Sequence, residues 1–159
     1  MTFLKFVLAM VLSFLPGLLG LMFAPVSSGQ NVWYSTLNIS ALTPAGWIFS
    51  IVWTVLYFLI GWALFFVMQQ KHTSNHHDKA GAYVSFGINI VLNLLWSFVF
   101  FGMHLPEAAL IVLTALIITA IFMSRAFYRI DKRAFWLVVP YILWLMFAFY
   151  LNAMIIYLN

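Results

Sequence analysis

The sequence contains no cysteine and very little charge, and each scarcity excludes a class of protein. Without cysteine there are no disulfides, no thiolate catalysis and no iron–sulfur ligation. Charged residues make up 6% of the chain and hydrophobic residues 66%, and the mean hydropathy is +1.08. A chain of 159 residues with this composition cannot hide its apolar surface in one water-soluble core. We therefore expect an integral membrane protein.

The few charged residues divide the sequence into apolar spans. Each span is close to the roughly 20 residues that a helix needs to cross a bilayer. We predict an all-α integral membrane protein, a single domain over residues 1–159 built as a five-transmembrane-helix bundle, with a lid formed by the first loop, residues 24–45. The predicted helices cover about residues 3–23, 46–68, 80–102, 106–127 and 134–157.

The first span resembles a secretion signal because Lys5 precedes an apolar stretch. It is longer than the usual apolar region of about 7 to 15 residues, and Phe23-Ala24-Pro25-Val26 is a poor cleavage site. We interpret it as the first helix. Pro16-Gly17 inside it are expected to kink or thin that helix and to give a neighbouring helix room for close approach.

Lysine and arginine are distributed unevenly between the two ends of the predicted bundle. All of them lie on the side shared by the N-terminus and the second and fourth loops. This asymmetry predicts a cytoplasmic N-terminus and an outside C-terminus. We expect the membrane to be a bacterial cell membrane. The net charge of +4 follows from this topology, so we expect contact with the lipid bilayer and none with nucleic acid. The basic residues are Lys5, Lys71, Lys79, Arg125, Arg129, Lys132 and Arg133.

Two asparagines interrupt the third span one helical turn apart. Asn89, Asn93 and Trp96 share one helical face, whereas the opposite face is aliphatic. A polar group left in hydrocarbon without a partner costs several kcal/mol, as an order of magnitude. This stripe is therefore predicted to face protein, either as an interhelical contact or as the wall of a buried cavity.

The second span places aromatic side chains at two depths. Trp47 lies near the membrane boundary, where an interfacial role is at least as well supported as a ligand contact. Trp53 lies roughly 9 Å further in, with Tyr57 one turn deeper on the same face. Their N–H and O–H groups need partners at that depth, so both side chains are expected to point into the bundle.

The fifth span repeats this arrangement with Tyr141, Trp144, Ala148 and Asn152 along one stripe. Interhelical packing and hydrogen bonding explain any one such stripe equally well. Three coincident stripes favour an aromatic-lined pocket for a flat hydrophobic ligand with a few polar atoms.

The connection between the first two spans is long for so small a bundle. Trp33 and Leu37 are buried-type residues, which favours a folded lid over a disordered linker. Thr43 is predicted to cap the second helix, with Pro44 in its first turn.

Catalytic and metal-binding patterns are weak. No span contains a nucleophile–base pair or an acidic residue at membrane depth, so the sequence shows no recognisable catalytic residues for hydrolysis. His72, His76 and His77 with Asp78 have metal-ligand spacing, but a solvated loop is the favoured interpretation. We expect no catalytic residue, no bound metal and no required cofactor.

Four motifs, in order along almost the whole chain, resemble the tryptophan-rich sensory protein (TspO) family, also called the translocator protein or peripheral benzodiazepine receptor family. The motifs are Trp33-Tyr34-x-x-Leu37-Asn38; Pro44-x-x-Trp47-x-Phe49-x-x-x-Trp53-Thr54-x-Leu56-Tyr57; Asn93-x-x-Trp96-x-x-x-Phe100-Phe101-Gly102; and Val139-Pro140-Tyr141-x-x-Trp144 with Leu151-Asn152.

The resemblance implies a five-helix bundle, often a homodimer, that binds porphyrins such as protoporphyrin IX and haem in tetrapyrrole sensing, transport or stress regulation. Light-dependent porphyrin degradation is the alternative, and sterols or benzodiazepine-type molecules are further candidate ligands. The family's pocket lies beneath the first loop among helices one, two, three and five. The expected ligand-binding residues are Trp33, Tyr34, Pro44, Trp47, Trp53, Tyr57, Asn89, Asn93, Trp96, Tyr141, Trp144 and Ala148.

The sequence also departs from the family pattern. Ser40, Ala41 and Leu42 stand where many members carry proline and aromatics, and Ala45 replaces a second proline. No basic residue follows Arg133, so the C-terminal sterol motif is not supported. No histidine lies inside a span, and His104 is the nearest candidate for haem iron. Recognition of the macrocycle by stacking, with or without a metal, is the expected mode.

Overall fold

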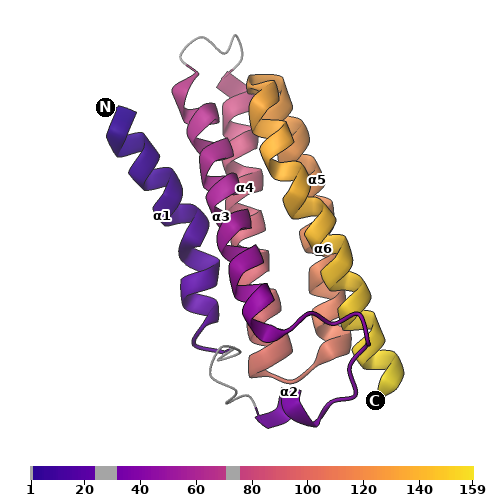
Figure 1. The fold of residues 1–159 in the computed structure, drawn as a ribbon. Helices are drawn as coiled ribbons and strands as arrows, with labels where there is room; N and C mark the ends of the chain where they lie inside the picture. The colour runs from indigo at the N-terminus through magenta and orange to yellow at the C-terminus, as the bar shows by residue number, and fades with distance from the viewer. Residues whose placement is uncertain (1, 24–31, 71–75) are drawn as a thin grey trace.

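The computed structural model describes residues 2–23, 32–70 and 76–159, and within them every regular element is helical (Figure 1). In this described part, five helices are long and apolar enough to cross a membrane. The predicted fold class, an all-α membrane bundle, is confirmed. The elements are α1 (Thr2–Gly20), α2 (Val32–Thr36), α3 (Gly46–Gln69), α4 (His76–Ser97), η2 (Phe98–Gly102), α5 (Pro106–Ile130) and α6 (Lys132–Leu158).

The N-terminus and the α3–α4 and α5–α6 connections lie at one end of the bundle, whereas α2 and the C-terminus lie at the other (Figure 1). α4 packs on α5, α5 on α6, α3 on α6, and α1 on α3 and α4. The core is aliphatic with few aromatics, as expected where helices meet face to face. Its most buried side chains include Ile60, Leu64, Leu113, Leu116, Met123, Phe127, Val138 and Leu145.

The start of α3 differs from the prediction that Thr43 caps the helix. The helix begins at Gly46, and its N-cap is Ala45, which makes no side-chain capping bond. The N–H of Thr43 instead closes a turn on the carbonyl of Ser40 at 2.9 Å. Because Thr43 belongs to that turn, Pro44 precedes the helix rather than occupying its first turn.

Close approach between α1 and α3 depends on glycine, as the sequence predicted for Pro16-Gly17. A Cβ at Gly17 would stand 2.6 Å from Cε2 of Tyr57. The same holds at Gly61, where a Cβ would stand 2.6 Å from Oγ of Ser13. The two helices therefore meet at a distance that no larger residue permits at these positions.

The end of the bundle that carries the N-terminus is tied together by charged and amide side chains. Nζ of Lys5 donates to the carbonyl of Met68 at 2.7 Å. Asp131, between α5 and α6, accepts hydrogen bonds from Nε2 of Gln70 at 2.9 Å and from the backbone N–H of Arg133 at 2.9 Å. The bonds from Arg133 hold the pKa of Asp131 below its usual value, so this carboxylate remains ionised.

Candidate ligand-binding site

A cavity of about 590 Å³ opens between α1, α3, α4, α6 and the segment that follows α2. Among the described residues, α5 contributes nothing to its wall. Most of the lining is aromatic or aliphatic, with hydroxyl and amide groups interspersed. The lining residues are Phe14, Pro16, Gly17, Leu18, Gly20, Leu21, Tyr34, Ile39, Thr43, Pro44, Ala45, Gly46, Phe49, Ser50, Trp53, Thr54, Tyr57, Asn93, Trp96, Ser97, Phe100, Phe101, Ala148, Leu151, Asn152 and Ile155.

Two stacked aromatic pairs stand in this wall. On α3, the rings of Trp53 and Tyr57 stack with centroids 5.3 Å apart and planes 27° apart. On the opposite side, Trp96 stacks on Phe100 at 5.4 Å and 24°. Each pair combines a large apolar surface with a hydrogen-bonding group, which suits a flat ligand with polar atoms at its edge.

A π-helical turn, η2, ends the third membrane span. The N–H of Met103 bonds to the carbonyl of Phe98 at 2.9 Å, five residues back, and His104 then adopts a left-handed φ of 58°. The wider turn inserts an extra residue and so changes which side chains face inward. In this turn both Phe100 and Phe101 line the cavity.

The asparagine stripe on α4 belongs to a chain of buried hydrogen bonds. The hydroxyl of Tyr57 donates to Oδ1 of Asn93 at 2.9 Å, and Nδ2 of Asn93 donates to the hydroxyl of Tyr141 at 3.1 Å. That hydroxyl donates in turn to Oδ1 of Asn89 at 2.8 Å, and Nδ2 of Asn89 donates to Oγ1 of Thr119 at 3.2 Å. This network, which we call the amide relay, joins α3, α4, α6 and α5.

A second polar link lies nearer α2. Nε1 of Trp96 donates to Oδ1 of Asn152 at 3.3 Å, and Nδ2 of Asn152 donates to the carbonyl of Pro106 at 2.9 Å. Asn152 lines the cavity but was not among the predicted ligand-binding residues, although the α6 stripe contains it. Because both of its amide ends are engaged, it fixes the Trp96 indole against the start of α5.

The α2 helix covers this end of the bundle. Trp33 stacks on His104 with ring centroids 4.6 Å apart and planes 15° apart, and its edge meets Phe100 at 5.6 Å. Tyr34 lines the cavity, and burial raises the pKa of its hydroxyl. The predicted lid spans residues 24–45, of which 24–31 lie outside the described residues.

The segment after α2 is anchored on α6. The backbone N–H of Asn38 donates to Oδ1 of Asn159 at 2.9 Å, and Nδ2 of Asn159 donates to the carbonyl of Asn38 at 3.0 Å. Oγ of Ser40 lies 3.1 Å from the hydroxyl of Tyr150. These bonds hold residues 38–40 against the C-terminal part of α6, where Ile39 lines the cavity.

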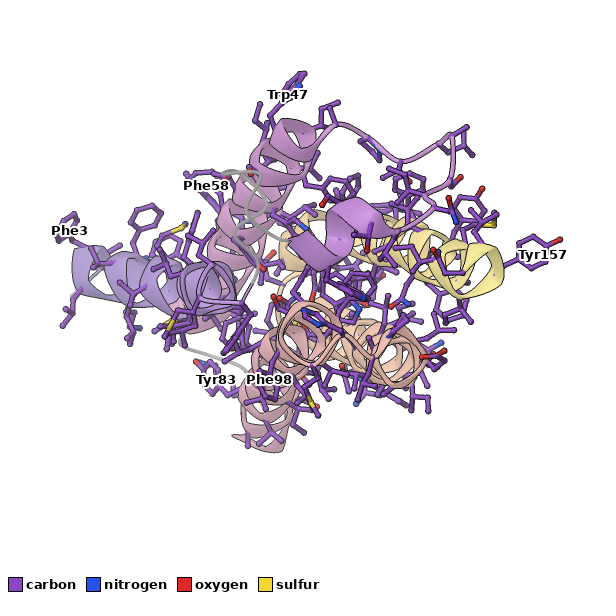
Figure 2. The ribbon with its side chains drawn as sticks, turned by 90° about the horizontal axis from the view of Figure 1, so that it is seen from below. Phe3, Trp47, Phe58, Tyr83, Phe98 and Tyr157 are labelled. Carbon is purple, nitrogen blue, oxygen red and sulfur yellow. The ribbon has the colours of Figure 1, made fainter. Side chains whose placement is uncertain are left out.

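The predicted ligand-binding residues occupy four kinds of position, and their role in binding stays a prediction. Asn89 and Tyr141 lie behind the wall, in the amide relay. Trp144 lies behind Phe49, with the two rings 5.7 Å apart, and Trp33 sits above the cavity on α2. Trp47 is 65% exposed and points away from the bundle (Figure 2). Those that line the cavity are Tyr34, Pro44, Trp53, Tyr57, Asn93, Trp96 and Ala148.

The α1 wall was missing from the predicted binding residues. Phe14, Pro16, Gly17 and Gly20 all line the cavity. The small residues of α1 were a usable signal, because Gly17 and Gly20 share one helical face with a proline beside them. The two glycines contribute space, because each brings backbone rather than a side chain to the wall.

The histidines do not form a metal site in the described part of the chain, where no group of three or more metal-ligand residues comes together. The prediction about His72 falls outside the described residues, as do the side chains of His76 and His77. His104 is exposed and stacks on Trp33 rather than lining the cavity.

Comparison with known proteins identifies the family. A family model described as the TspO/MBR family matches residues 7–158. The chain belongs to the TspO/MBR family. The resemblance noted in the motifs is thereby confirmed, and it agrees with a multi-pass integral membrane protein with five candidate spans.

Relatives within the TspO/MBR family come from bacteria, archaea and mammals. The chain is 39% identical over 127 residues to the tryptophan-rich protein TspO of Chlorobaculum tepidum, covering 80% of this chain and 79% of that protein. It is 36% identical over 129 residues to the TspO protein of Archaeoglobus fulgidus, covering 81% of each. It is 28% identical over 142 residues to the translocator protein of Bos taurus, covering 87% of this chain and 82% of that protein.

Proposed function

We propose that this TspO/MBR protein binds porphyrins, such as protoporphyrin IX or haem, and similar flat hydrophobic molecules in the cavity beneath α2, and that it acts in tetrapyrrole sensing or transport. The observation that carries the proposal is the cavity of about 590 Å³ with its two stacked aromatic pairs. Ligand pockets generally measure about 300–1,000 Å³ and combine apolar walls with a few oriented polar groups.

Polar groups at the cavity wall support a ligand with polar atoms at its edge. The Tyr57 hydroxyl and the Asn93 amide lie on one side, and the Asn152 amide lies nearer α2. Each is held by a hydrogen bond to a neighbouring helix, so its orientation is fixed before a ligand arrives. Such preorganisation favours discrimination between ligands that differ in the position of a carboxylate or carbonyl.

Trp144 supplies a further candidate donor. Its indole Nε1 is buried and has no hydrogen-bond partner among the residues that the structure describes, although most buried polar groups have one. It packs edge-on against Phe49, which lines the cavity. A ligand that displaces the Phe49 ring would satisfy this N–H, and Trp144 is therefore kept in the proposed binding set.

Titration with protoporphyrin IX, followed by quenching of tryptophan fluorescence, tests the proposal. Trp53→Phe and Trp144→Phe should each raise the dissociation constant by roughly threefold to tenfold, because the smaller ring loses the indole N–H and part of the aromatic contact. Trp136→Phe is the matched control because Trp136 lies on the outside of α6 and is 67% exposed. Equal effects from all three substitutions would refute the assignment of the cavity.

Light-dependent degradation of porphyrin is the second candidate function. The stacked Trp53 and Tyr57 rings place two oxidisable side chains at the cavity wall, which favours this alternative. Illumination of the complex with product analysis separates the two functions. Bleaching at the rate measured with an unrelated membrane protein supports a binding protein only, whereas defined products that vanish in Trp53→Phe support an enzyme.

We further propose a cell-membrane location with a cytoplasmic N-terminus, because the described basic residues gather at the N-terminal end of the bundle. Because the natural chain lacks cysteine, Asn159→Cys introduces a single thiol at the C-terminus. A membrane-impermeant maleimide should label it from outside intact cells. Labelling only after the cells are lysed would contradict this orientation.

We also propose a homodimer that packs through α4. A Cβ at Gly81 or Gly87 would meet nothing within 4 Å, and Val84, Ile88 and Val91 are exposed along the same helix. Such a surface of small and branched residues suits a second membrane helix. Val84→Cys should form an intermolecular disulfide under mild oxidation, and Ile111→Cys on α5 is the exposed control. Equal cross-linking of the two variants would contradict the proposed surface.

A further inference from the structure

A second concave site lies on the outside of the bundle, in the groove between α3 and α6. Its volume is about 450 Å³, and it shares no lining residue with the cavity beneath α2. An arginine stands at one end and the remaining lining is apolar. The lining residues are Phe58, Leu59, Trp62, Phe66, Arg133, Trp136 and Leu137.

Arg133 is fixed at the head of this groove. Its guanidinium lies 4.4 Å from the centroid of the Phe66 ring. Asp131 accepts hydrogen bonds from Nε at 3.2 Å and from Nη2 at 2.9 Å, which leaves the N–H groups of Nη1 for another acceptor. The Arg133 side chain is 68% exposed, so an acceptor outside the bundle can reach it.

The groove has the length of one bilayer leaflet. From Phe66 to Phe58 along α3 the rise is about 12 Å, close to half of the roughly 30 Å hydrocarbon thickness. Aromatic contacts continue along this wall, with Trp62 at 6.4 Å from Phe66 and at 5.4 Å from Phe58 between ring centroids. Phe58 itself points away from the bundle (Figure 2). An occupant would therefore have its polar head at Arg133 and an apolar chain reaching towards the midplane.

We propose that this groove binds an anionic phospholipid, with its phosphate on Arg133 and one acyl chain along the aromatic wall. The positive charge near the groove favours an anionic lipid as its occupant. Lys132 is exposed next to Arg133 in the chain, with Nζ 5.7 Å from the centroid of the Tyr128 ring, and it has no acidic partner in the described part of the chain. The α5–α6 connection at the head of the groove therefore keeps a positive excess despite Asp131. A fixed guanidinium is suited to phosphate oxygens, whereas the single hydroxyl of a sterol would leave this charge uncompensated.

Quenching by brominated lipids tests the proposal, since Trp62 and Trp136 line the groove. The protein is reconstituted in phosphatidylcholine vesicles with a small fraction of phosphatidylglycerol. In one sample the phosphatidylglycerol carries brominated chains, and in the other an equal mole fraction of phosphatidylcholine carries them. Phosphatidylglycerol should quench more strongly than phosphatidylcholine at equal mole fraction. The Arg133→Gln variant should need roughly fivefold more phosphatidylglycerol to reach the same excess of quenching over phosphatidylcholine. Arg125→Gln, an equal charge change at the same end of the bundle, is the matched control and should retain the excess.

A second variant separates lipid binding from damage to the α5–α6 connection. Leu137→Phe leaves Arg133 and Asp131 intact but narrows the groove, and it should also reduce the excess quenching, with an unchanged far-ultraviolet circular dichroism spectrum. Three results would overturn the proposal. They are an absence of excess quenching in the unmodified protein, an equal loss in Arg125→Gln, and relief of quenching by unbrominated cholesterol at a lower mole fraction than by unbrominated phosphatidylglycerol.

Discussion

Removal of the Tyr141 hydroxyl should destabilise the bundle without a change in packing. Tyr141→Phe breaks two hydrogen bonds, and it leaves Nδ2 of Asn93 and Oδ1 of Asn89 buried without a partner. Hydrogen bonds between membrane helices contribute about 0.6 kcal/mol on average and up to about 1.7 kcal/mol. Two such losses predict a decrease of about 1 to 3 kcal/mol in the free energy of unfolding, which agrees with the cost of about 1–3 kcal/mol for a buried unsatisfied group in soluble proteins.

The free energy of unfolding can be measured by titration with sodium dodecyl sulfate in mixed micelles, followed by far-ultraviolet circular dichroism. Tyr157→Phe is the control, because Tyr157 is 81% exposed and points away from the bundle (Figure 2). The double variant Asn89→Leu, Tyr141→Phe should lose less than the sum of the two single variants, because it removes donor and acceptor together. Equal stability of Tyr141→Phe and Tyr157→Phe would refute the relay as a source of stability.

Two further predictions concern the α1 contact and the α5–α6 connection. Gly17→Ala should lower the free energy of unfolding by about 1 to 3 kcal/mol, since its Cβ must displace the buried ring of Tyr57. Thermal denaturation in detergent measures this change, and a stability equal to that of the unmodified protein would contradict the close contact. The pKa of Asp131 is lowered on folding, so its stabilising contribution should be complete above its ordinary pKa near 3.8 and be lost as the pH falls through the lower value in the folded protein. The free energy of unfolding, measured from about pH 6 down to about pH 2, should fall less steeply at the acid end for Asp131→Asn than for the unmodified protein. An equal fall in the two proteins would contradict the role of the bond to Arg133.

The location of the asparagine stripe could be predicted from the sequence, but its partners could not. The cost of placing an amide in lipid requires Asn89 to face protein, whichever helix it meets. In the structure one partner of Asn89 is Thr119 on α5. The sequence analysis had no reason to select α5, because that helix carries no aromatic stripe. Periodicity assigns a face to each helix and carries no information on which faces meet.

The π-helical turn could not be predicted from the sequence, whereas the α1 wall was missed although its small residues indicated it. An extra residue in the turn at Phe98–Gly102 alters hydrogen bonding but not hydropathy, so the segment reads as ordinary helix. Gly17 contributes the absence of a side chain, which no search for polar or aromatic groups detects. The prediction for Thr43 was wrong for the opposite reason. Its local sequence fits an N-cap, but its backbone N–H is bonded to the carbonyl of Ser40 in the preceding turn.

The amide relay distinguishes two parts of the bundle by how their helices are held together. It connects α3, α4, α5 and α6 by side-chain hydrogen bonds near the level of the cavity. In the described part of the chain, α1 is joined to the others by one such bond, from Lys5 to the carbonyl of Met68, and otherwise by close packing. The four helices of the amide relay are therefore held by directional bonds, whereas α1 is held mainly by close packing. For the ligands proposed above, α1 is the wall whose displacement breaks the fewest hydrogen bonds, and the Asn93 amide keeps its bonds to Tyr57 and Tyr141.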